Sequence, residues 1–75
     1  MGHAAYFRDK IEKQGDIENL NGIMGDLNSA IENVTLKKDK ASTGFQKVNL
    51  ATELKALKLI LSMGKDKLNE LKKGQ

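Results

Sequence analysis

The stretch from residue 50 to residue 71 reads LATELKALKLILSMGKDKLNEL, and its apolar residues recur at alternating spacings of four and three. This alternation places one apolar stripe along a helix that packs against a second helix, as in a coiled coil. Gly64 alone interrupts the stripe, because it stands where the spacing calls for a large side chain. The members of the stripe are Leu50, Leu54, Leu57, Leu61, Gly64, Leu68 and Leu71.

Capping residues mark the ends of this predicted helix. Thr43 with Gln46 three residues later fits the capping-box pattern, whereas Asn49, directly before the stripe, is a simpler N-cap. We favour Thr43. Gly74 is a typical stop signal at the other end. The sequence therefore predicts a helix over about 44 to 72.

An earlier stretch, from Ile17 to Val34, shows the same alternation and follows Asp16, a suitable N-cap. It predicts a helix over about 17 to 36, and the polar run over 37–42, where the apolar spacing stops, is predicted to be a connecting loop. We therefore expect an all-α fold, an antiparallel helical hairpin with a coiled-coil seam. The predicted seam within the chain consists of Ile17, Leu20, Met24, Leu27, Ile31, Leu54, Leu57, Leu61 and Leu68.

A third segment precedes the hairpin. Tyr6, Phe7 and Ile11 give it a small apolar face that is out of phase with the later seam, and Gly15 marks the change of phase. The segment is expected either to fold back as a short first helix, which would make a small three-helix bundle, or to fray, because helices this short are marginal without tertiary contacts.

The length of the chain limits its stability. Its 75 residues and 8.3 kDa make one small domain over 1–75, with residues 1–3 expected to be a disordered terminus or a cloning remnant. A domain of this size buries only about 60% of its unfolded surface. Without cysteine it has no disulfide to compensate, so self-association or a partner is the usual remedy.

A second apolar face supports that expectation. Ala56, Leu59 and Met63 lie at spacings of three and four on the long helix, separate in angle from its seam. One neighbouring helix cannot cover both faces, so we expect these residues, together with Tyr6 and Phe7, to bind a partner. The function expected from this face is a non-catalytic, helix-mediated protein-protein interaction module. It would be a small adaptor, chaperone or assembly subunit that self-associates as a homo-oligomer or docks on a helical partner.

Two glycines weaken the first long helix. Gly22 and Gly25 each cost about 1 kcal/mol relative to alanine inside a helix. They are either exposed positions of a weak helix or small residues that let another backbone approach closely.

The charge is divided unevenly along the chain. Residues 1–36 carry three basic and six acidic side chains, a balance of −3, whereas residues 37–75 carry ten lysines and four acidic side chains, a balance of +6. The two halves either neutralise each other or leave lysines for an anionic partner. The alternative function is therefore a basic module that binds nucleic acid or another anionic surface non-specifically. Its candidate anion-binding residues are Lys37, Lys38, Lys40 and Lys47. Phe45, the one aromatic residue near them, is expected in the core of the long helix instead.

Other classes find little support in the sequence. Without cysteine there is no thiolate zinc site and no thiol nucleophile, and His3 is the single histidine. We expect no catalytic, metal-binding or cofactor-binding residue, no cofactor and no small-molecule substrate, and hence no enzyme. The longest uninterrupted apolar run has three residues, so no membrane span is predicted. The opening residues also lack the pattern of a cleavable secretion signal, which favours a cytoplasmic protein or export by a signal-less route.

Overall fold

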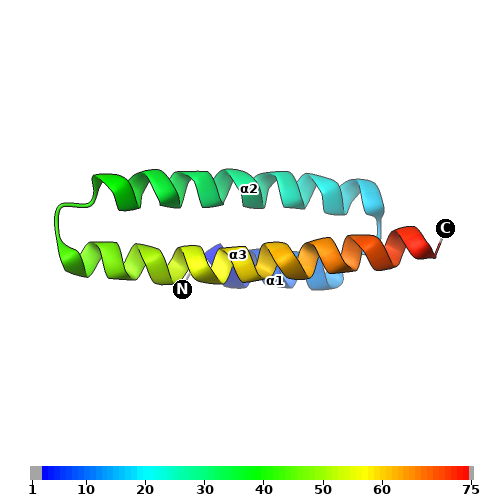
Figure 1. Ribbon diagram of the computed structural model, residues 1–75. Helices are drawn as coiled ribbons and strands as arrows, with labels where there is room; N and C mark the ends of the chain where they lie inside the picture. The colour runs from blue at the N-terminus through cyan, green and yellow to red at the C-terminus, as the bar shows by residue number, and fades with distance from the viewer. Residues whose placement is uncertain (1–2, 75) are drawn as a thin grey trace.

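The computed structural model describes residues 3–74, which form three helices and no strand. Helix α1 spans His3–Lys13, α2 spans Ile17–Lys40 and α3 spans Gly44–Lys73. Helices α2 and α3 run antiparallel along an elongated body measuring 48 × 17 × 15 Å, and α1 lies beside both (Figure 1). The predicted all-α hairpin is therefore confirmed. His3, expected in a disordered terminus, is the first residue of α1, while residues 1 and 2 lie outside the described residues.

Both long helices begin at the predicted N-caps. The Asp16 carboxylate accepts a hydrogen bond from the backbone N–H of Glu18 at 2.9 Å. The Thr43 hydroxyl accepts one from the backbone N–H of Gln46 at 3.1 Å, so α3 begins at Thr43 and not at Asn49. These bonds satisfy amides that have no partner within the helix, which fixes where each helix starts.

The connection between the long helices is shorter than the sequence predicts. Helix α2 continues through Lys37 and Lys38 and ends at Lys40, so the expectation of a loop over 37–42 is wrong for its first four residues. Lysine has a high helix propensity, and its charge is stabilising near the carbonyl end of a helix. The loss of apolar spacing after Leu36 therefore marks only the end of the buried face, and residues 41–43 make the turn.

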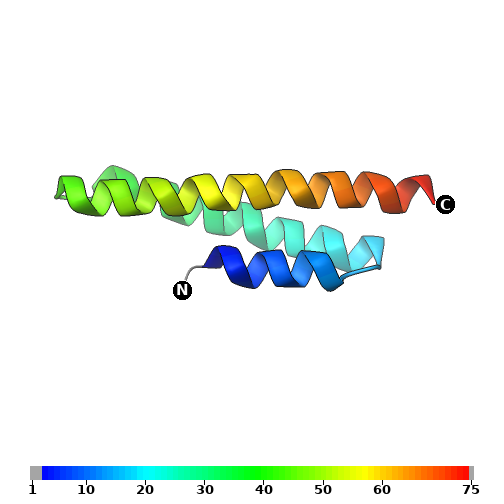
Figure 2. The same cartoon turned by 90° about the horizontal axis from the view of Figure 1, so that it is seen from below.

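The core runs along the hairpin and includes α1. Phe7 and Ile11 of α1 are buried against both long helices, so the N-terminal segment packs as a third helix. Helix α1 runs parallel to α3 and covers only the half of the hairpin that lies away from the α2–α3 turn (Figure 2). The buried apolar residues are Phe7, Ile11, Leu20, Met24, Leu27, Val34, Leu54, Leu57 and Ile60. Partly buried residues packed against them include Ile31, Leu61 and Leu68, three members of the predicted seam.

Gly64 marks the level at which all three helices meet. It is buried, and a Cβ atom built on it would overlap Met24 Sδ and lie 3.3 Å from Ile11 Cδ1. Met24 belongs to α2 and Ile11 to α1, so the missing side chain makes room for both neighbours. The interruption of the leucine stripe therefore lets Met24 of α2 and Ile11 of α1 approach the same turn of α3.

A lysine of α3 also holds the carboxyl-terminal end of α1. The Nζ atom of Lys67 donates hydrogen bonds of 2.6 Å to the backbone carbonyl oxygens of Ile11 and Glu12. These carbonyl groups lie in the last turn of α1, where the helix dipole favours a positive charge, and the Ile11 carbonyl also accepts a hydrogen bond from the backbone N–H of Gln14. Lys67 therefore caps α1 from a neighbouring helix.

The glycines of α2 differ from Gly64. No atom lies within 4 Å of a Cβ built on Gly22 or on Gly25, and both residues are exposed. Neither glycine is needed for a close approach by α1 or α3.

Replacing these glycines should therefore have opposite effects. Gly64→Leu should lower the free energy of unfolding by about 1–3 kcal/mol, because the added atoms displace Met24 and Ile11 from a filled site. Gly22→Ala should raise it by about 0.5–1 kcal/mol, because alanine is the better helix former and meets nothing. Urea denaturation followed by circular dichroism measures both changes. A Gly64→Leu variant as stable as the parent would show that Met24 and Ile11 do not fill this position.

Candidate interaction surface

One face of α3 carries most of the large apolar side chains that the fold leaves exposed. The exposed fractions are 77% for Phe45, 65% for Val48, 62% for Leu59 and 41% for Met63. Thr52 and Ala56 continue the spacing of three and four between them. We call this set the outer stripe, and its members are Phe45, Val48, Thr52, Ala56, Leu59 and Met63.

The position of the outer stripe follows from helix geometry. Leu57 and Leu61 each stand two residues from Leu59, which is about 200° around a helix with 3.6 residues per turn. Leu57 is fully buried in the core, so Leu59 must face away from it. Helix α1 occupies the flank between these two faces, where Ile60 and Gly64 are buried. Within residues 3–74, no helix lies over the outer stripe itself.

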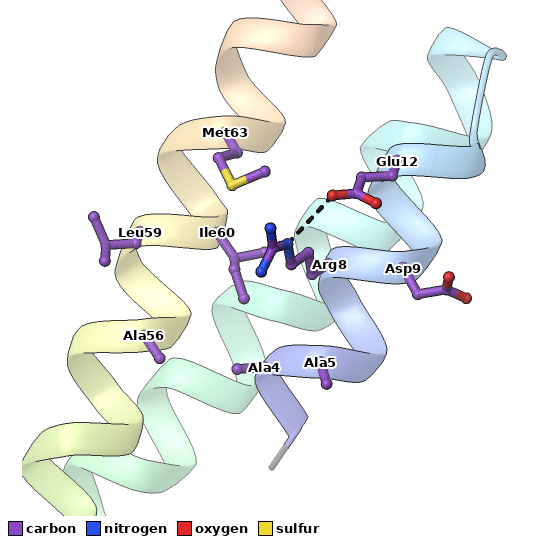
Figure 3. Close-up of a pocket in the computed structure, with 9 residues that line it drawn as sticks. All are labelled: Ala4, Ala5, Arg8, Asp9, Glu12, Ala56, Leu59, Ile60 and Met63. Atoms are coloured by element: carbon purple, nitrogen blue, oxygen red, sulfur yellow. Dashed lines mark hydrogen bonds and ion pairs between the residues drawn. The ribbon is translucent and has the colours of Figure 1, made fainter. Parts of the chain in front are cut away.

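An open groove of about 650 Å³ separates the outer stripe from α1. Figure 3 shows that α3 forms one wall and α1 the other, with the small side chains of Ala4 and Ala5 on the α1 side. The Arg8 side chain lies across the groove and pairs with Glu12 at 3.2 Å (Figure 3). The groove is lined by Ala4, Ala5, Arg8, Asp9, Glu12, Ala56, Leu59, Ile60 and Met63.

A second hollow lies on the other side of Leu59. It is lined by Ala51, Leu54, Lys55, Lys58 and Leu59 itself. Leu59 is therefore a ridge between two hollows, and helices commonly pack by fitting such ridges into the grooves of a neighbour. The surface around Leu59 has the shape of a helix-packing surface.

The structure brings together only part of the predicted partner-binding face. Ala56, Leu59 and Met63 line one groove. Phe7 is not on this surface: it is 7% exposed and belongs to the core, because α1 turns its Phe7 and Ile11 face inward. Tyr6 is exposed but does not line the groove.

Tyr6 instead contacts residues of its own helix. Its ring meets the edge of the Phe7 ring at 5.3 Å between centroids, and the Lys10 Nζ atom lies 5.3 Å from the Tyr6 ring centroid. Lys10 follows Tyr6 by four residues, whereas the groove wall consists of the flank that carries Arg8 and Glu12. Tyr6 therefore lies outside the surface formed by Leu59 and its neighbours.

Sequence reasoning missed two residues of the outer stripe. Phe45 was expected in the core, but it is the most exposed of the large apolar side chains, and Val48 is exposed beside it. Their spacing to Thr52, Ala56 and Leu59 continues the pattern of three and four, and this was the signal that could have found them.

The four candidate anion-binding lysines lie near the turn between α2 and α3. Lys37 and Lys40 line a hollow of about 490 Å³ at this end of the hairpin, together with Gln46 and Asn49 of α3. Lys38 and Lys47 do not line it. Ala41 and Leu50 complete the lining, and the ammonium and amide groups of the other four residues suit a phosphate or carboxylate.

The described residues contain neither of two further kinds of site. Across residues 3–74, no three side chains of His, Cys, Asp or Glu gather closely enough to hold a metal ion. None of the three helices combines the length and the apolar character needed to cross a bilayer. No protein-family model, curated protein or solved structure matches the chain.

Substitutions at two neighbouring leucines should separate the core from the outer stripe. Leu57→Ser should lower the free energy of unfolding by about 3 kcal/mol or more, because it removes a fully buried side chain and buries a hydroxyl. Leu59→Ser in the monomer should change it by less than about 0.5 kcal/mol. Urea denaturation at a concentration that keeps the protein monomeric measures both. Equal losses would place Leu59 in the core.

Proposed function

We propose that this protein is a non-catalytic interaction module whose outer stripe binds an apolar helix surface, either on a second copy of itself or on a helical partner. The observation that carries the proposal is the outer stripe: four large apolar side chains stand exposed along a single face of α3. Contiguous exposed apolar surface of this kind typically marks a contact with another macromolecule.

The energetics favour a covered stripe. Each large apolar side chain that passes from water into an interface contributes about 1.5–3 kcal/mol. The stability of a 75-residue domain without disulfides is only a few kcal/mol. A partner that binds the folded chain adds its binding free energy to that stability by mass action.

The shape of the surface favours a helix as the binding element. The outer stripe extends over five turns of α3 with spacings of three and four, and hollows flank Leu59 on both sides. A helix whose own side chains repeat at these spacings fits such a surface, in the way an amphipathic helix lies in a groove. We accordingly assign the protein to the small adaptors, chaperones or assembly subunits, with cytoplasmic residence as part of the same proposal.

Sedimentation equilibrium over a wide concentration range tests the proposal. We expect the mass to exceed that of one chain at high concentration, and Leu59→Ser to raise the dissociation constant by about tenfold or more. Leu36→Ser is the matched control: Leu36 is 55% exposed but lies on α2, outside the outer stripe, so its loss should leave the mass unchanged.

Two results would contradict this function. If Leu59→Ser unfolds the chain as Leu57→Ser does, the outer stripe belongs to the core. If Leu36→Ser weakens association as much as Leu59→Ser does, association is unspecific and the outer stripe has no special role.

The hollow at the hairpin turn supports a second candidate function, binding of a polyanion such as nucleic acid. Two of its lining residues, Lys37 and Lys40, belong to the basic half of the chain. Binding of this kind should weaken steeply with salt, and Lys37→Gln with Lys40→Gln should reduce the slope by about two released ions. Retention of a single-stranded oligonucleotide that is independent of salt, or unaffected by the substitutions, would argue against it. Lys72→Gln with Lys73→Gln is the control of equal charge.

A further inference from the structure

We propose that the outer stripe pairs with the same stripe of a second copy of this chain, with the two α3 helices antiparallel around a two-fold axis near residue 54. This inference rests on the proposed function and names its partner. It is carried by the symmetry of the outer stripe, by the charges at its two ends and by the groove beside it.

The outer stripe reads similarly in both directions. Phe45 and Met63 have residue 54 as their midpoint, and so do Thr52 and Ala56, while Val48 and Leu59 fall half a residue away. An antiparallel pair centred there sets Phe45 against Met63 of the second copy, and Val48 against Leu59. A two-fold interface needs such a self-complementary patch, because each residue must meet its counterpart in the reversed chain.

Charges beyond the outer stripe select the antiparallel direction. After Met63 the same face of α3 carries Asp66, which has no ion pair among the described residues. In the antiparallel register Asp66 falls opposite residue 42 of the second copy, directly before its α3. There it lies near the amino end of that copy's α3, where the helix dipole favours a negative charge. The two-fold axis repeats this arrangement at the other end of the pair.

A parallel pair would lack this complementarity. In register, it would set Asp66 against Asp66 and Glu70 against Glu70, two repulsive pairs on one face. It would also align the dipoles of two 30-residue helices in the same direction. The apolar side chains of the outer stripe can be buried in either direction, so the charges determine that the pair is antiparallel.

The groove between α1 and α3 lies beside the most exposed large apolar side chain of the second copy. In the antiparallel register, Phe45 of the second copy lies beside Met63, at the end of the groove whose α1 wall carries Glu12 (Figure 3). The ring is 77% exposed in the single chain and has no other apolar cover. Symmetry places one ring beside each of the two grooves.

Lys55 is the one unfavourable charge in this arrangement. It borders the outer stripe close to the two-fold axis and lines the hollow on the far side of Leu59. Its counterpart in the second copy lies close by, so the two ammonium groups must extend into water while their aliphatic stems stay in the interface. The pairing therefore depends on the apolar side chains of the outer stripe, on the aliphatic stems of the two Lys55 side chains and on the charges at the two ends of the stripe.

Cysteine cross-linking tests the register directly, because the full chain contains no cysteine. We expect Phe45→Cys and Met63→Cys chains, mixed and oxidised, to form a disulfide between the two variants. Neither variant alone should cross-link, because its own copies lie about 27 Å apart at 1.5 Å per residue. Rapid cross-linking of Phe45→Cys alone would reveal a parallel pair and overturn the proposal.

A charge reversal provides a second measurement that leaves the outer stripe intact. Asp66→Lys should raise the dissociation constant about threefold to tenfold, because it sets a lysine against the positive end of a helix. Asp26→Lys makes the same change of charge on an exposed position of α2 and should have a smaller effect. Equal effects of the two reversals would overturn the register.

The outcomes distinguish this inference from the proposed function. A protein that stays monomeric at every concentration overturns pairing with a second copy. A dimer with the parallel cross-link overturns only the register and leaves an interaction module. Loss of the fold in Leu59→Ser overturns both.

Discussion

The contact at Gly64 is the constraint on which the arrangement of the three helices depends. Met24 of α2 and Ile11 of α1 both occupy space that a side chain at this position would fill. With α2 over one face of α3 and α1 over the adjacent flank, a single face remains uncovered, and it carries Leu59 and Met63. The position of the exposed apolar surface is thus a consequence of how closely α1 and α2 approach the same turn of α3.

Much of the fold could be predicted from the sequence because its signals are local. The N-caps at Asp16 and Thr43 and the alternating spacings act within one or two helical turns. The end of α2 could not be read in this way, because the lysines after Leu36 lose the apolar pattern and still favour a helix. The packing of α1 depends on Gly64 and on Lys67, both more than 50 residues away along the chain.

The candidate surface was predicted less completely, for a related physical reason. Periodicity identifies the faces of a helix, but it does not say which face a neighbouring helix covers. The sequence predicts the exposure of Ala56, Leu59 and Met63 because the leucine stripe lies on the opposite face of the helix and is predicted to be buried. Phe7 was expected on the exposed surface and Phe45 in the core, but only Phe7 lies where neighbouring helices pack. Phe7 faces α2 and α3, whereas Phe45 lies on the face of α3 that no helix within residues 3–74 covers.

Because α1 is short, the wall of the groove that it forms is the least stable part of the fold. Eleven residues form its outer wall, and two hydrogen bonds from Lys67 hold its last turn. A helix of this length has little stability of its own, so its release from the hairpin is a sub-global opening of lower free energy than complete unfolding. A ligand between Ala5 and Leu59 can contact α1 only while α1 is packed on the hairpin. The ligand therefore stabilises the packed α1 by the same free energy that α1 contributes to binding. Binding in the groove and folding of α1 are therefore thermodynamically coupled.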